Sequence, residues 1–157
     1  MRLDDELLEF LQRPLMCIIA AVDCGGRPSA GRGIGFHVLE DRERLDLIFS
    51  GWQWPQLEPC IRQTAKLAVT FVSPSDYVTF QIKGPAAMRD TDTQDLERAD
   101  QFITKARDEL AALGVLPSII APWLTDREAK VVRLDASEIY VQTPGVNAGM
   151  LAGTRPR

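Results

Sequence analysis

An arginine lies among three glycines in the stretch Gly31-Arg32-Gly33-Ile34-Gly35. Glycine has no side chain beyond its α-carbon and lets a ligand approach the backbone closely, so Arg32 is placed to bind an anion. Further along, the hydroxyl of Ser50 and the backbone amide of Gly51 can donate hydrogen bonds to a phosphate. Each has a plainer alternative, a surface ion pair for Arg32 and an ordinary turn for residues 50–51. The chemistry these residues indicate is anion binding.

Histidine and cysteine, the common bases, nucleophiles and metal ligands, are sparse. The single histidine, His37, has no cysteine or histidine at metal-ligand spacing and no nucleophile motif beside it, so we expect neither a zinc site nor a catalytic triad. The three cysteines are far apart and odd in number, which fits a reducing cytoplasm rather than a disulfide framework. We expect Cys17 to be buried and inert, and Cys24 to lie in a turn. The sequence therefore names no catalytic residue and no metal ligand.

Composition bounds the class of protein. The chain has 157 residues, of which 45% are hydrophobic and 25% charged, with a net charge of −4, as is typical of one globular domain. No apolar run reaches the roughly 18–20 residues of a membrane span. The acidic residues near the N-terminus do not resemble a signal peptide, and an acidic chain lacks the basic face that nucleic acid requires. We expect one cytoplasmic domain over residues 1–157, without a membrane or nucleic-acid partner.

Short strands are the elements that must position these residues. We expect strands at residues 15–22, 29–39, 45–49, 66–72, 78–83 and 128–142. Short connections between them favour antiparallel pairing, and a small six-stranded sheet protects its edges best by closing into a barrel. The first strand is apolar at every position, so its outer face needs a helix or a second subunit to cover it.

Helices are expected at a few places between the strands. One short helix is expected near the N-terminus and another over residues 56–64. A long helix is expected to begin at a capping box formed by Thr91 and Gln94 and to end at Gly114. Residues 143–157 form a turn-rich tail. The apolar stripe of the long helix consists of Leu96, Ala99, Phe102, Ile103, Ala106, Leu110 and Leu113.

The order of these elements is accompanied by several matching segments. They are residues 15–22 with the turn at 25–28, and residues 45–49, 67–71, 79–84 and 142–145. Together they resemble the pyridoxamine 5′-phosphate oxidase-like, flavin mononucleotide (FMN)-binding split-barrel family. The resemblance implies a mainly β fold, a six-stranded antiparallel split β-barrel with one long helix between strands five and six. It also implies a homodimer with FMN in a groove at the dimer interface, and a flavin-dependent oxidoreductase of unknown substrate.

Within this resemblance, the residues expected to contact the cofactor are Arg32, Ser50, Gly51, Trp52, Gln81 and Lys83. The indole of Trp52 would form a wall against the flavin ring, and the alternative is that Trp52 and Trp54 pack at the barrel rim or the dimer seam. Gln81 and Lys83 lie on the polar face of the fifth strand. They would contact the edge of the flavin ring or its phosphate, or else they face water.

The chain departs from the family in the loop after the third strand. The oxidases of the family have a serine followed by Arg-Lys there, which grips the cofactor phosphate, whereas this chain has Pro55-Gln56-Leu57. Arg32, Arg62 and Lys83 are the candidate replacements, since a phosphate favours charged donors. A second hypothesis follows from the missing pair. It is a non-catalytic dimer whose groove holds another ligand, such as haem ligated by His37, or none.

Overall fold

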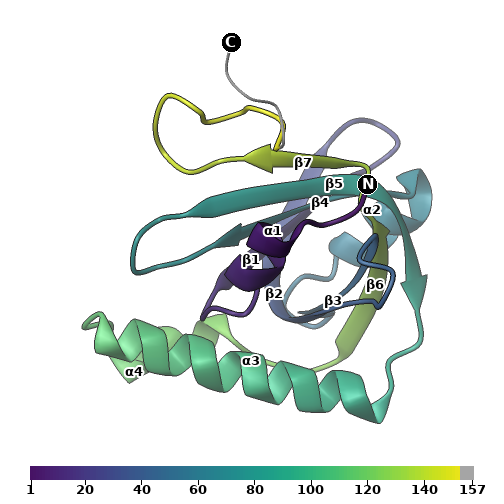
Figure 1. The fold of residues 1–157 in the computed structure, drawn as a ribbon. Coiled ribbons are helices and arrows are strands. Elements are labelled where there is room, and N and C mark those ends of the chain that lie inside the picture. Colours follow the sequence, from purple (N-terminus) through teal and green to yellow (C-terminus); the bar gives the residue numbers. More distant parts are fainter. Residues whose placement is uncertain (153–157) are drawn as a thin grey trace.

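An antiparallel β-barrel forms the centre of the computed structural model, which describes residues 1–152 (Figure 1). Its strands are β1 (Met16–Val22), β2 (Pro28–Val38), β3 (Arg44–Ser50), β4 (Lys66–Val72), β5 (Thr79–Arg89), β6 (Ala129–Asp135) and β7 (Glu138–Val141). Neighbouring strands follow the order β4-β1-β2-β3-β6-β5-β7, and β4 also pairs with β5. The extra pairing closes six strands into a barrel, as predicted, and leaves β7 as an added strand beside β5.

Helices join and cover this barrel. Within residues 1–152 they are α1 (Asp5–Phe10), α2 (Leu57–Thr64), α3 (Thr93–Ala112), α4 (Pro117–Ile120) and the 3-10 turn η1 (Ala121–Trp123). The long helix α3 lies between β5 and β6 along the chain, as predicted, and Gly114 follows it with a φ of 86°. None of the helices in this range combines the length and the apolar composition that crossing a membrane requires.

The capping box of α3 lies one residue later than predicted. Asp92, rather than Thr91, is the N-cap, and its carboxylate accepts the Asp95 amide at 2.9 Å. The Asp95 carboxylate in turn accepts the Asp92 amide at 3.0 Å, so Gln94 takes no part in the box. Asp95 also binds the guanidinium of Arg89. This second bond, to a residue of β5, favours the observed frame over the predicted one.

The predicted final strand, residues 128–142, was wrong as a single element. It is divided into β6 and β7 by Ala136 and Ser137. β6 pairs with β3 and with the second half of β5, whereas β7 pairs with the first half of β5. The chain crosses over Gly84 at this point, where a Cβ would lie 3.0 Å from the carbonyl carbon of Asp135 and clash with its oxygen. The break is therefore a corner of the barrel, set by a contact between strands.

The barrel interior holds the main core. Side chains from α1 and α2 pack onto it together with the inward-facing residues of the strands. The largest of these that are fully buried include Ile19, Leu45, Leu47, Phe49, Phe71 and Ile82. This core fixes which face of each strand points outward, because successive side chains of a strand alternate between its two faces.

A second core lies between α3 and the outer face of β2, β3 and β6. Figure 1 shows α3 running along this side of the barrel. Gly35 allows the close approach, since a Cβ there would lie 3.2 Å from the Cα of Ala99. Leu96 and Leu113, predicted in the apolar stripe, are instead 45% and 48% exposed near the two ends of the helix. The residues buried in this core are Ile34, Ile48, Ala99, Ile103, Ala106, Leu110, Ile120, Leu124 and Val131.

Apart from Met16 at the start of β1, the outer face of β1, β4 and the first half of β5 contributes no residue to this second core. We call it the uncovered face and define it by two rows of paired residues, given below. On β1, Cys17, Ile19 and Ala21 point into the core, whereas Ile18 and Val22 are 38% and 37% exposed. The expectation that both faces of this apolar strand are covered is therefore not met within one chain.

Candidate functional site

Three of the residues predicted to bind a cofactor lie on the uncovered face. Strand pairing places them in two adjacent rows, each running across four strands. The first row contains Arg32, Ile18, Thr70 and Gln81. The second row contains Ala30, Ala20, Ala68 and Lys83. Directly paired residues of antiparallel strands lie about 4.5–5.5 Å apart, so Arg32, Gln81 and Lys83 border one surface. Gln81 is held in place there, because its Nε2 donates to Thr70 Oγ1 at 3.0 Å.

A groove of about 480 Å³ opens along the second row. Its walls include Ala20, Pro28, Lys66, Ala68, Lys83 and Glu138. Within residues 1–152, neither lysine forms an ion pair with a carboxylate. Small apolar walls with cations at the border suit a flat molecule that carries negative charge.

Tyr140 of β7 borders the same region of the uncovered face. The Lys83 Nζ lies 4.6 Å from the centre of the Tyr140 ring, which is a cation–π contact. The Tyr140 hydroxyl donates to the carboxylate of Glu138, and this hydrogen bond raises the pKa of Tyr140 above its ordinary value. Glu138 keeps its negative charge in this hydrogen bond and pairs directly with Lys83 across β5 and β7, so the groove carries one acidic group beside this lysine.

Ser50 and Gly51, also predicted to bind a phosphate, are used within the protein. Ser50 is fully buried at the end of β3, and its hydroxyl donates to the carbonyl of Arg127 at 2.7 Å. The same oxygen accepts the amide of Gln53 at 3.1 Å. The Gly51 amide donates to the carbonyl of Glu128 at 2.9 Å. These bonds fasten the loop after β3 to the segment before β6, so neither donor is free for a phosphate.

Trp52 and Trp54 have different surroundings. Trp52 is 50% exposed, and the guanidinium of Arg127 lies 4.5 Å from the centre of its ring. Trp54 packs on the barrel core against Gly31, which agrees with the alternative of packing at the rim. The guanidinium of Arg32 lies 4.8 Å from the centre of the Trp123 ring, which is a cation–π contact. No carboxylate of residues 1–152 pairs with Arg32.

The loop that replaces the family's Arg-Lys pair offers no cation. Pro55 and Gln56 are exposed, and Leu57 is fully buried in the core at the start of α2. Arg62, one of the candidate replacements, donates to Glu58 at 2.9 Å across one turn of α2. Arg32 and Lys83 thus remain as replacements, and Lys66 joins them. The sequence pattern alone did not single out Lys66, because only the β4–β5 pairing brings it to the groove.

His37 lies elsewhere on the barrel. It pairs with Asp46 on the side that carries α3, away from the groove. The hypothesis that His37 ligates a haem held in the groove is therefore wrong, because strand pairing places the imidazole on the other side of the barrel. Burial and the nearby charge of Arg98 lower the pKa of His37, with Asp46 and Asp95 acting in the opposite direction. The imidazole is therefore neutral near pH 7.

This arrangement of strands is found in solved structures. HupZ from Group A Streptococcus has 16% identity and a TM-score of 0.58, over 94% of this chain and 99% of that one. The haem storage protein HutZ from Vibrio cholerae has 18% identity and a TM-score of 0.52, over 90% and 95%. A pyridoxamine 5′-phosphate oxidase-related, FMN-binding protein from Nostoc punctiforme has 15% identity and a TM-score of 0.53, over 94% and 89%. This chain has the split-barrel fold. A search of protein-family models and one of curated proteins give no match.

The groove of this split barrel can be tested against FMN, which joins a flat ring system to a phosphate. Lys66 and Lys83 line the groove and supply charge for the phosphate. Gln81 lies outside the groove lining, in the neighbouring first row, where its amide offers a donor and an acceptor for the ring edge. The small side chains between them leave space for the ring. The residues present therefore fit such a molecule, although the charge comes from β4 and β5 and not from the loop after β3.

Proposed function

We propose that this split barrel is a cytoplasmic homodimer that binds FMN in the groove of its uncovered face and acts as a flavin-dependent oxidoreductase. The observation that carries the proposal is the placement of Arg32, Gln81 and Lys83 in adjacent rows of a surface with apolar centre. The fold similarity to an FMN-binding protein supports the choice of ligand.

The chain's own residues would bind and orient the cofactor. Lys83 and Lys66 would hold its phosphate, and Gln81, fixed by Thr70, would hydrogen-bond the ring edge. When bound, flavin supplies two-electron transfer to or from a nicotinamide or another small organic substrate. The second subunit would cover the groove and exclude water from the ring. Its position follows from Ile18 and Val22, whose exposed apolar side chains favour association.

The absorbance spectrum of the purified protein is the direct test. We expect flavin bands, or quenching of FMN fluorescence when micromolar FMN is added to the colourless protein. Lys83→Gln should weaken FMN binding about tenfold, because one charge-assisted contact is worth about 1.5 kcal/mol. Arg107→Gln is the matched control, since it removes one charge from an exposed site on α3. A colourless protein that does not quench micromolar FMN would refute the proposal.

A second candidate is a non-catalytic haem-binding dimer. Two of the solved structures with this fold are HupZ and the haem storage protein HutZ. The neutral imidazole of His37 makes no hydrogen bond within residues 1–152 and has a nitrogen free to ligate iron. This candidate predicts a Soret band on addition of haem that is lost in His37→Ala. His37 lies on the side that carries α3, so haem ligated by it would lie outside the groove. If no band forms, ligation of haem by His37 is excluded.

A further inference from the structure

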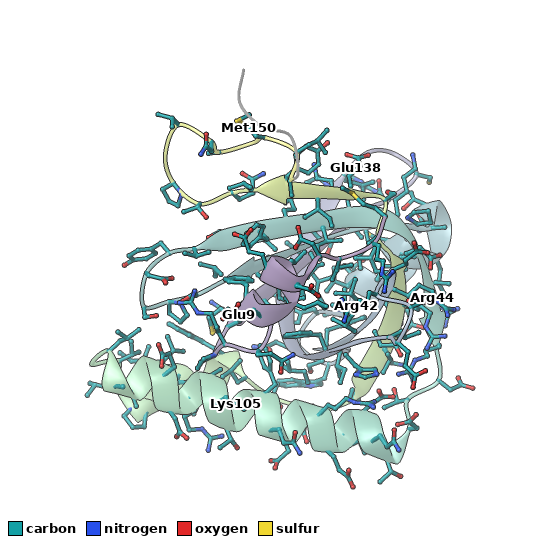
Figure 2. The ribbon with its side chains drawn as sticks, viewed as in Figure 1. Glu9, Arg42, Arg44, Lys105, Glu138 and Met150 are labelled. Carbon is teal, nitrogen blue, oxygen red and sulfur yellow. The ribbon has the colours of Figure 1, made fainter. Side chains whose placement is uncertain are left out.

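A second cavity, of about 330 Å³, lies between α3, β2 and the segment that joins α1 to β1. Figure 2 shows Lys105 on α3 and Glu138 on β7 at opposite sides of the barrel, so this cavity is separate from the groove on the uncovered face. We call it the α3 cavity. The residues used below from its lining are Arg13, Phe36, His37, Arg98, Phe102 and Lys105.

The α3 cavity is strongly cationic in an acidic chain. Three cations, Arg13, Arg98 and Lys105, line it beside the neutral His37, and no aspartate or glutamate of residues 1–152 does. Lys105 forms no ion pair within these residues, including with Glu109 one turn further along α3. A concave surface of one charge sign concentrates ions of the opposite sign.

The two arginines differ in how firmly they are already bound. Arg13 donates to Asp76 at 2.5 Å and to Ser73 at 2.8 Å, which fixes its guanidinium at the border of the cavity. Arg98 has only long contacts, 3.3 Å to Asp95 and 3.2 Å to Gln94. Charge-assisted hydrogen bonds are normally about 2.7–2.9 Å, so Arg98 can turn toward a better acceptor at little cost.

The wall beside these cations is aromatic. The rings of Phe36 and Phe102 lie edge to face, with centres 6.0 Å apart, and both line the cavity. Both side chains pack against the main core and keep part of their surface exposed. A small inorganic ion would leave this aromatic surface in water, whereas an aryl group would cover it.

We propose that the α3 cavity binds a small anion carried on a flat apolar group, namely an aryl carboxylate, sulfonate or phosphate. The charged head would contact Lys105 and Arg98, and the ring would rest on Phe36 and Phe102. The proposal requires neither flavin in the groove nor haem on His37.

The single histidine provides the readout. In untagged protein, His37 gives the only histidine signals in the nuclear magnetic resonance spectrum. Its charged neighbours are Asp46 on β3, Arg89 on β5, and Asp95 and Arg98 on α3, with Arg13 and Lys105 across the cavity. A bound anion stabilises the imidazolium and raises the pKa of His37. Benzenesulfonate is a suitable probe because its own charge is constant across this pH range.

We expect benzenesulfonate to shift the His37 signals with saturation and to raise the His37 pKa. Sulfate should bind more weakly, and neutral benzenesulfonamide should leave the pKa unchanged. Lys105→Gln should weaken benzenesulfonate binding about tenfold, since it removes one charged contact. Arg107→Gln, on the same helix but outside the cavity lining, should leave binding within about twofold, because a screened surface charge has little effect.

Three outcomes would overturn the proposal. The first is the absence of a saturable shift at millimolar benzenesulfonate. The second is equal weakening by Lys105→Gln and Arg107→Gln, which would indicate general charge attraction. The third is equal binding of sulfate and benzenesulfonate, which would remove the role of the aromatic wall. Circular dichroism of both variants confirms that each is folded. The FMN titration uses the other side of the barrel, so the two proposals can fail separately.

Discussion

Trp54 packs its indole ring against the α-carbon of Gly31. A Cβ at position 31 would lie 2.6 Å from Cδ2 of Trp54 and 2.9 Å from Cδ1 of Leu57, which is closer than real Cβ contacts come. The glycine before Arg32 therefore makes room for a tryptophan of the protein itself. The packing of Trp54 explains the glycine at position 31, without the sequence-based expectation that a ligand approaches there.

Gly31→Ala should lower the free energy of unfolding by about 1–3 kcal/mol, because the added methyl overpacks this contact. In a Trp54→Ala background, the same change should cost less than about 0.5 kcal/mol, because the cavity left by the indole accepts the methyl. Urea unfolding of the four proteins in this double-mutant cycle measures both values. Equal costs in the two backgrounds would show that Trp54 is not the obstacle.

Asp46 joins two arginines on the side of the barrel that carries α3. It accepts hydrogen bonds from Arg89 and Arg133 at 2.8–3.0 Å and is 3% exposed. Asp46→Asn should lower the free energy of unfolding by about 2–3 kcal/mol near pH 7, since both arginines lose a charged partner. Asp135→Asn, at an exposed carboxylate of β6 that makes no ion pair within residues 1–152, should change it by less than about 0.5 kcal/mol.

The same carboxylate predicts a pH dependence. Burial raises the pKa of Asp46, but the hydrogen bonds from Arg133 and Arg89 outweigh it, and the folded-state pKa lies below the ordinary value. A lowered carboxyl pKa gives stability that is present above the unfolded-state pKa of about 3.9 and is lost as the pH falls through the folded-state pKa. The stability difference between the wild type and Asp46→Asn should therefore be constant from about pH 5 to 7 and shrink below about pH 4. A stability difference that stays constant below about pH 4 would contradict the lowered pKa of Asp46.

The uncovered face predicts a dimer that one charge can disrupt. Ile18→Lys places an ammonium in the first row, where the symmetry of a homodimer brings two such charges close together. We expect the wild type to sediment as a dimer and the variant as a monomer. Leu96→Lys, an equally large change at an exposed leucine of α3, should leave the dimer intact. A wild-type protein that is monomeric at micromolar concentration would remove the basis of the proposed groove.

The three cysteines should differ sharply in reactivity. Burial raises the pKa of the Cys17 thiol to about 12, although a hydrogen bond involving Gly33 acts in the other direction, and Cys24 is exposed. The thiolate is the reactive form, so a disulfide reagent near pH 8 should modify Cys24 rapidly and leave Cys17 unmodified until the protein unfolds. Cys24→Ser should remove the fast phase. Rapid modification of two thiols in the folded protein would contradict the burial of both Cys17 and Cys60.

Local patterns predicted most of the strands, because alternation and turn residues are properties of neighbouring positions. The split after Asp135 escaped prediction because no glycine or proline marks it. It arises from contact with Gly84, about fifty residues earlier in the sequence. The frame of the α3 cap likewise depends on Arg89, a residue outside the helix. The first of these features was set by a contact between distant segments, and the second by a side chain of the preceding strand, six residues before Asp95.

The residues of the candidate site were likewise predicted only where a local pattern determines their position. Alternation along the fifth strand placed Gln81 and Lys83 on its outer face, which the structure agrees with. It did not reveal that Lys66 adjoins them, because strand register is a tertiary property. Ser50 and Gly51 have the right donors for an anion, but the residues that occupy these donors come from a segment more than seventy positions later.

The helix α3 covers one outer face of the barrel and leaves the other uncovered. An isoleucine-to-lysine substitution should therefore have a different effect on each face. Ile48 points outward and is buried under α3. Replacing it by lysine would bury a charge there, detach α3 from the barrel and unfold the chain at any protein concentration. Replacing outward-facing Ile18 by lysine should leave each chain folded and, in the proposed dimer, alter only the mass of the particle in solution. Denaturation curves identify the outward-facing positions that are covered by α3, and hydrodynamic measurements identify those on the uncovered face. Neither measurement requires a ligand.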